Sequence, residues 1–292
     1  MRGRWLRVVS AGPQTTVQDL GRTGWAHLGV PLAGAADRSS AATANRLVGN
    51  DPQAAVLEVT LGGFVAVAEG PVTIALAGAR CDASVDGTAV GHASTVSVPD
   101  GATIALGTAR SGLRCYLAVR GGIDAPEVLG SRSTDTLSGL GPPPVADGDR
   151  VAVGDLAGPW PSETTAFGDV GDGAGDVVLH AVAGPRDDAV VDLAALAAGE
   201  WVVDPRSDRI GVRLGRDPDT DDPAVRLLPG RDEVPSEGVA LGSVQIPPSG
   251  EPVLFLADHP VTGGYPVVAV LTASSTDRAA QLVPGQRIRL RL

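Results

Sequence analysis

The chain has 292 residues, a formal charge of −11 at pH 7 and a pI near 4.7. This acidic balance argues against nucleic-acid binding, which needs a basic surface. All 23 of the residues counted as lysine or arginine are arginines. The chain therefore cannot carry biotin on a lysine, form a Schiff base or use a P-loop lysine.

Cysteine and histidine spacing gives no metal signature. Cys81 and Cys115 are far apart in the sequence, without a C-x-x-C pair, and are expected to be two buried thiols in strands. The acidic run Arg216–Pro223 is expected to be a solvated surface loop rather than a metal site. The opening residues lead us to expect no signal peptide, and the sequence contains no run of ~18 apolar residues. We expect a soluble, cytoplasmic protein.

The N-terminal region begins with an expected strand, Trp5–Val9, followed by a glycine-rich polar segment, Gly12–Asp37. Its weak apolar periodicity predicts a long ordered loop, and such loops are often functional. A helix is expected at Arg38–Val48, with Gly49 after its end. Asp37 is expected to cap this helix, with ligand binding as the alternative.

Short strands separated by glycine-containing turns dominate the next hundred residues. The expected strands are Leu57–Leu61, Phe64–Ala68, Val72–Leu76, Cys81–Val85, Thr95–Val98, Thr103–Leu106, Cys115–Val119 and Val151–Val153. Gly78 is taken as a strand end. This spacing is typical of an all-β barrel or sandwich.

The composition changes at residues 154–176, where Gly, Asp, Pro and Ser predict a linker between residues 1–153 and 177–292. The second half is expected to contain helices at Asp187–Ala198 and Asp277–Leu282. Its expected strands are Val177–Ala181, Trp201–Val203, Val239–Leu241, Val244–Ile246, Val253–Leu256 and Gln286–Leu290. The fold class is thus mainly β with a few short helices, in two lobes.

Several motifs in order resemble the carboxyltransferase family of proteins. They are Q-T-T-V-Q-D-L-G-R (14–22), H-L-G-V-P (27–31), L-E-V-T-L-G-G (57–63), V-L-G-S-R-S-T (128–134), S-D-R-I-G-V-R-L (207–214), S-E-G-V-A-L-G-S-V-Q-I-P-P-S-G-E-P (236–252) and T-G-G-Y-P (262–266). That family includes the C subunit of bacterial 5-oxoprolinase, proteins called allophanate hydrolase subunit 2, and half of the carboxyltransferase domain of urea carboxylase. The resemblance implies two cyclophilin-like β-barrel lobes with an active site between them.

The resemblance implies one of three functions. The first is the C subunit of an ATP-dependent 5-oxoprolinase, which converts 5-oxo-L-proline to L-glutamate with partners resembling the A and B subunits. The second is a carboxyltransferase acting on urea or a related amide, with biotin on another chain. The third is a regulatory protein that antagonises a kinase inhibitor. No cofactor is expected to be covalently bound to this chain, and ATP would be used by the complex.

The motifs supply carboxylates, arginines, amides and glycine-exposed backbone, a set suited to orienting a small polar amide. The candidate catalytic residues are Asp19, Glu237 and Asp258. The candidate substrate-binding residues are Gln18, Arg22, His27, Arg132, Arg209, Gln245, Thr262, Gly263, Gly264 and Tyr265. We expect Arg209 to reach a carboxylate of the substrate or of the protein, and we expect Gln14–Asp37 and Ser236–Pro266 to line one cleft.

Overall fold

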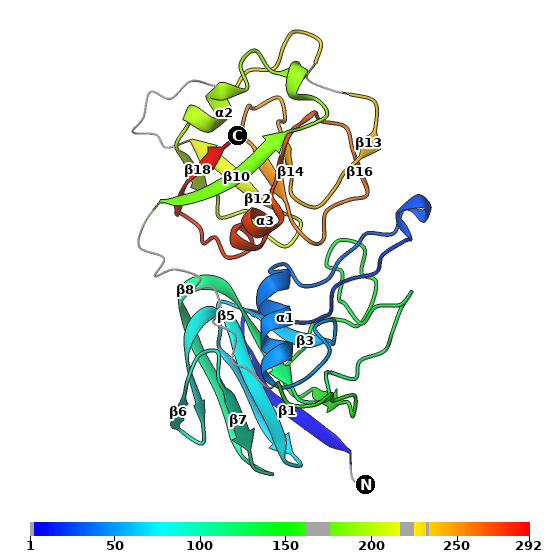
Figure 1. Ribbon diagram of the computed structural model, residues 1–292, viewed down its shortest axis with the longest axis vertical. Helices are drawn as coiled ribbons and strands as arrows, with labels where there is room; N and C mark the ends of the chain where they lie inside the picture. Colours follow the sequence, from blue (N-terminus) through cyan, green and yellow to red (C-terminus); the bar gives the residue numbers. More distant parts are fainter. Residues whose placement is uncertain (1–2, 162–175, 217–224, 232–233) are drawn as a thin grey trace. The chain divides into compact units, whose positions relative to one another are not determined.

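A computed structural model describes residues 3–161, 176–216, 225–231 and 234–292 (Figure 1). The chain divides into two compact units. The first comprises Met1–Arg22, Ala33–Asp135 and Gly139–Gly173, and the second comprises Thr23–Leu32, Thr136–Ser138 and Ala174–Leu292. Two short segments from the N-terminal half of the sequence therefore group with the C-terminal unit.

The N-terminal unit is built on a nine-stranded sheet with the path β2-β3-β8-β4-β1-β9, to which β5, β6 and β7 add. Its strands are β1 (Arg4–Ala11), β2 (Gln14–Gln18), β3 (Val56–Thr60), β4 (Phe64–Glu69), β5 (Val72–Val85), β6 (Thr88–Val90), β7 (Thr95–Val98), β8 (Thr103–Val119) and β9 (Arg150–Val153). Alternation fixes the faces of strands such as β4, where Phe64, Ala66 and Ala68 are buried. These side chains lie in the main core of the unit.

Helix α1 (Arg38–Leu47) packs on β5 and β8 (Figure 1). Small side chains allow this close contact, because Ala41 and Ala44 on the helix meet Ala75 and Ala77 on β5 in a second core. Asp37 caps the helix: its Oδ1 accepts a hydrogen bond from Ser40 N at 2.9 Å. The predicted helix and the capping role of Asp37 are confirmed.

Two sequence interpretations of this unit are wrong. The segment Gly12–Asp37 is not all loop, because Gln14–Gln18 forms β2 and pairs with β3. Its β-branched run Thr15-Thr16-Val17 favours extended backbone although most of its side chains are polar. Gly78 does not end a strand either: β5 continues through it, and β8 likewise joins two predicted strands. The β5–β8 pairing absorbs the irregularity in register shifts between Gly78 and Ala83.

The C-terminal unit is a closed barrel with the strand order β10-β17-β14-β15-β12-β11-β18. The strands are β10 (Val177–Ala183), β11 (Trp201–Val203), β12 (Gly211–Arg216), β14 (Ser243–Gln245), β15 (Val253–Phe255), β17 (Val267–Leu271) and β18 (Arg287–Arg291). A separate two-stranded ribbon joins β13 (Glu237–Gly238) to β16 (Thr262–Gly263). The helices are α2 (Ala194–Ala198) and α3 (Ala273–Ala279), with 3-10 turns at Ala26–Leu28 and Asp187–Ala189. Mainly β architecture in two lobes is confirmed, the N-terminal sheet being a half-barrel.

The predicted helix Asp187–Ala198 is interrupted. Val190 forms an isolated bridge with Leu227, and Val191 N donates to Arg226 O at 2.8 Å. These β-branched residues are extended, so only a 3-10 turn and the short α2 remain helical. Val239–Leu241 is not a strand either, because Ala240 to Gly242 lead into the turn before β14. Most of the predicted linker (residues 162–175) and most of the acidic run (217–223) lie outside the described residues.

No helix in the described part of the chain is long and apolar enough to cross a membrane.

Candidate functional site

The Asp19 carboxylate fastens the end of β2 to the segment 131–133. Oδ1 accepts hydrogen bonds from Ser131 Oγ at 2.7 Å, Ser133 Oγ at 2.6 Å and Gly21 N at 2.7 Å. Oδ2 accepts from Arg132 N at 2.6 Å. With both oxygens engaged, this candidate catalytic carboxylate orders the loop that follows β2.

Gln18 and Arg22 flank Asp19 and reach the same neighbouring segment. Gln18 Nε2 donates to Thr134 O at 2.9 Å and to Thr16 Oγ1 at 3.0 Å. Arg22 Nη2 donates to Ser133 O at 2.5 Å, and Nε donates to Val128 O at 3.3 Å. Both side chains are fully buried, with relative exposures of 0% for Gln18 and 1% for Arg22. The structure thus brings three predicted site residues together around the backbone of 133–134.

Around this backbone, three polar side-chain atoms are buried with no hydrogen-bond partner among the described residues: Gln18 Oε1, Arg22 Nη1 and Thr134 Oγ1. The side chain of Arg132, by contrast, turns away to Ala125 O and to Asp124, 3.5 Å away. Its backbone N–H, not its guanidinium, joins the Asp19 network. We name Gln18, Arg22 and Thr134 the buried polar cluster.

Arg209 and Asp258 form a buried ion pair in the C-terminal unit. Arg209 Nε lies 3.0 Å from Asp258 Oδ2, and Nη2 lies 3.0 Å from Oδ1. Asp258 Oδ2 also accepts from Thr136 N at 2.9 Å and from Thr136 Oγ1 at 2.6 Å. Arg209 does reach a carboxylate, and it belongs to the protein. Because the Asp258 oxygens are occupied by bidentate and backbone donors, the geometry supports an ordering role for this candidate base.

The residues of the β13–β16 ribbon form a separate cluster. Glu237 pairs with Arg186, and the hydrogen bond from Arg186 lowers the pKa of Glu237. Gln245 Nε2 donates to Tyr265 O at 2.9 Å. A Cβ on Gly263 would lie 2.6 Å from that same Nε2, so a larger residue there would displace the Gln245 amide. Thr262 and Gly263 lie on β16, and Gly264 and Tyr265 follow it.

The histidine predicted to line the site is exposed. His27 Nδ1 lies 3.0 Å from Gly24 O in the segment Thr23–Leu32, which groups with the C-terminal unit. His259, beside Asp258, is buried with Nδ1 2.8 Å from Pro260 O. The expectation that Gln14–Asp37 and Ser236–Pro266 share one cleft stays a prediction, as do the catalytic assignments.

Sequence reasoning missed Thr136, Arg186 and the hydrogen bond between the two free cysteines. Thr136 follows the quoted motif 128–134, so its closeness to the motif's end was the available signal. Arg186 follows Gly184-Pro185 after a strand, as a loop arginine. The cysteines lie on paired strands: Cys115 is buried, and a hydrogen bond with it lowers the pKa of the half-buried Cys81.

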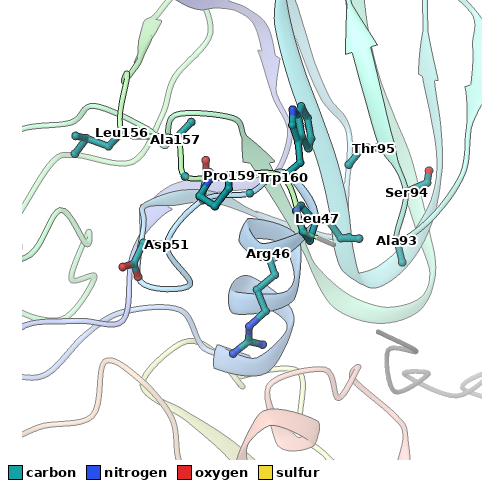
Figure 2. A pocket seen from close by; sticks show the side chains of 14 residues that line it. Arg46, Leu47, Asp51, Ala93, Ser94, Thr95, Leu156, Ala157, Pro159 and Trp160 are labelled. Atoms are coloured by element: carbon teal, nitrogen blue, oxygen red, sulfur yellow. The ribbon is translucent and has the colours of Figure 1, made fainter. Parts of the chain in front are cut away.

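A cavity of about 1030 Å³ lies elsewhere in the N-terminal unit, between the end of α1, the turn at 93–95 and the segment 156–161 (Figure 2). Arg120 holds that segment by donating to Gly158 O at 2.8 Å and stacking 4.1 Å from the Trp160 ring centre. None of the predicted site residues lines this cavity. Its size alone therefore does not identify it as the chemical site.

Comparison with known proteins identifies the family. The family described as "Carboxyltransferase domain, subdomain A and B" matches residues 28–292. The C subunit of 5-oxoprolinase from Escherichia coli is 34% identical over 97% of this chain and 89% of its own length. The solved structure of TTHA0988 is 32% identical with a TM-score of 0.88, and this chain covers 56% of that one. The Kluyveromyces lactis urea carboxylase structure is 26% identical with a TM-score of 0.85, and this chain covers 27% of it. The chain belongs to the family of carboxyltransferase domains with subdomains A and B.

Proposed function

We propose that this chain is the C subunit of an ATP-dependent 5-oxoprolinase. Together with partners resembling the A and B subunits, it would convert 5-oxo-L-proline to L-glutamate. The observation that carries the proposal is the 34% identity to the 5-oxoprolinase C subunit across 97% of this chain and 89% of the E. coli protein. A second relative of the same name, from Haemophilus influenzae, is 28% identical over 97% of the chain.

The chemistry of the site residues is compatible with amide recognition. Opening a lactam requires donors for its carbonyl oxygen and an acceptor for its N–H. The buried polar cluster offers an amide acceptor at Gln18 for the lactam N–H, and Arg22 adds a guanidinium donor for a negatively charged group of the substrate. These residues would bind and orient a substrate, while the Asp19 network fixes the loop that carries them.

We assign two cofactors to other chains: the ATP of the proposed 5-oxoprolinase and the biotin of the alternative carboxyltransferase. Gln18 Oε1 is an acceptor and would repel phosphate oxygens, so the buried polar cluster does not fit a triphosphate. The absence of lysine leaves no attachment point for biotin. When bound by a partner, ATP would supply the free energy for ring opening.

The alternative function is carboxyl transfer to urea or a related amide. It is favoured by the urea amidolyase of Lachancea kluyveri, 31% identical over 97% of this chain, and by the urea carboxylase structure. This chain covers only 17% of that amidolyase and 27% of that structure. The alternative is therefore a comparison with one part of much longer proteins.

The partnership is tested by co-expressing this chain with A-type and B-type 5-oxoprolinase subunits. The proposal expects this chain to elute with its partners in size-exclusion chromatography. It also expects ATP-dependent glutamate formation from the complex and none from the isolated chain. Full activity from the isolated chain would contradict it.

A further inference from the structure

We infer that Gln18, Arg22 and Thr134 bind a carboxylate together with the N–H group on the neighbouring carbon, the pair of groups that 5-oxoproline presents. This inference rests on the proposed function and assigns its substrate site.

Arg22 places a positive charge inside the N-terminal unit. Its side chain is fully buried, and its guanidinium donates to two backbone carbonyls, Ser133 O and Val128 O. Neither of these partners carries a charge. A buried cation is costly unless an anion compensates its charge. Nη1, which has no acceptor among the described residues, is the point at which an anionic oxygen would bind.

The orientation of Gln18 is fixed by its neighbour. Thr134 O can only accept a hydrogen bond, so the group 2.9 Å from it must be the NH₂ of the Gln18 amide. The Gln18 oxygen is then the free atom. Being an acceptor only, it requires a donor such as a ligand N–H.

Gln18 and Arg22 both contact the backbone at Ser133 and Thr134. The Thr134 N–H donates to Val17 O at 2.9 Å, beside Gln18, and the preceding carbonyl, Ser133 O, is the one that Arg22 holds. Gln18 Nε2 and Arg22 Nη2 therefore donate to the carbonyls of two consecutive residues, Thr134 O and Ser133 O, so all three side chains belong to one short stretch of backbone. The Thr134 hydroxyl can donate or accept and suits either ligand group.

This arrangement selects among small amides. A carboxylate oxygen accepts from Arg22 Nη1, and the adjacent ring N–H donates to Gln18 Oε1. Urea supplies N–H groups but no negative charge for Arg22. The backbone of Gly141 covers the guanidinium so closely that a Cβ there would lie 2.9 Å from Nη2. Because Gln18, Arg22 and Thr134 are all buried, a ligand can reach them only when neighbouring backbone moves.

Three probes separate the two ligand groups: 5-oxo-L-proline, 2-pyrrolidinone without the carboxylate, and 5-oxotetrahydrofuran-2-carboxylate with oxygen in place of N–H. Their dissociation constants are measured by calorimetry on the full chain in its complex. We expect 2-pyrrolidinone to bind about 10- to 100-fold more weakly than 5-oxoproline, since a charge-assisted hydrogen bond is lost. We expect the lactone acid to bind about 3- to 10-fold more weakly. Equal affinities for all three probes would overturn the inference.

Thr134→Val is the matched variant, because it removes an unpaired hydroxyl with little change of shape. Thr15→Val is its control: Thr15 is equally buried, but its hydroxyl donates to Ala11 O at 2.7 Å. We expect Thr134→Val to weaken 5-oxoproline binding about 3- to 10-fold at unchanged Tm, and Thr15→Val to lower Tm at unchanged affinity. A lower Tm with unchanged affinity in Thr134→Val would mean that the cluster holds only structural water, which overturns the inference.

The two proposals fail separately. If the complex forms glutamate but Thr134→Val and the three probes show no selectivity, the site assignment is wrong and the proposed function stands. If the complex forms no glutamate, the proposed function is wrong. The probe series then still supports the site when selectivity is present and overturns it when selectivity is absent.

Discussion

Arg209 and Asp258 face each other as a bidentate pair with both nitrogen–oxygen distances at 3.0 Å, and their side chains are 1% and 0% exposed. Thr136 adds two donors to the same carboxylate. Because the pair is desolvated, removing one partner leaves a buried charge uncompensated.

We therefore predict that Asp258→Leu lowers the free energy of unfolding by about 3–5 kcal/mol. The double variant Arg209→Met with Asp258→Leu removes both charges and should recover much of that loss. Urea denaturation followed by circular dichroism measures both. A single variant as stable as the parent would show that the pair contributes nothing.

Arg209→Lys separates the structural role from a substrate-binding role. Lysine keeps the charge but loses the planar fork. We expect reduced stability with unchanged KM for 5-oxoproline in the complex. A raised KM in a variant of normal stability would instead place Arg209 at the substrate.

The Asp19 network predicts a loss of stability on substitution. Asp19→Ala leaves Ser131, Ser133 and the Arg132 N–H without their acceptor, and we expect a cost of about 2 kcal/mol or more, the usual size for a hydrogen bond to a charged group. Asp124→Asn is the control, because its carboxylate is 61% exposed and pairs with Arg132 at 3.5 Å. It should change stability by less than ~1 kcal/mol. Equal effects of the two variants would contradict the assignment.

We predict that the ion pair of Glu237 makes the thermal stability depend on pH. The hydrogen bond from Arg186 lowers the pKa of Glu237 in the folded protein. A depressed carboxyl pKa contributes stability that is present above the unfolded value, ~4.3, and is lost as the pH falls through the folded value. Tm measured from pH ~6 down to ~3 should therefore separate the parent from Glu237→Gln at the upper end and bring them together at the lower end.

Glu127→Gln is the control for this titration, since Glu127 is exposed. Its Tm profile should follow that of the parent at every pH. A Glu237→Gln profile parallel to that of the parent over the whole range would rule out the linkage.

Asp37→Ala should destabilise α1. It removes the acceptor for Ser40 N at the helix start, a change that costs about 1 kcal/mol. Asp51→Ala is a comparison outside a helix, because Asp51 Oδ1 accepts from Gln53 N in an exposed turn. Chemical denaturation should show the larger loss for Asp37, and the reverse order would count against the cap.

The sequence predicted correctly those helices and strands whose bounds depend on residues close together in the chain. Asp37 and Gly49 bracket α1 because capping depends on residues three or four apart, and Trp201–Val203 appears with the predicted bounds of β11. The strand β2 was missed because Thr15, Thr16 and Gln18 are polar yet buried. The burial of Gln18 depends on a hydrogen bond to Thr134 O, which lies 116 residues away in the sequence.

The site shows the same division. The motif 14–22 singled out Gln18, Asp19 and Arg22, and the structure brings all three to the segment 131–134. The sequence could not distinguish an engaged carboxylate from an available one. In the sequence, Asp19 and Asp258 both appear as aspartates in polar, glycine-containing motifs. Only the folded chain shows that hydrogen-bond donors surround each carboxylate.

Glutamate formation from 5-oxo-L-proline tests the proposed function most directly. The complete complex is assayed with and without ATP, and again with this chain omitted. We predict glutamate only when this chain, its partners and ATP are all present. Undiminished glutamate formation without this chain, or ATP-dependent turnover of urea with none of 5-oxoproline, would contradict the account.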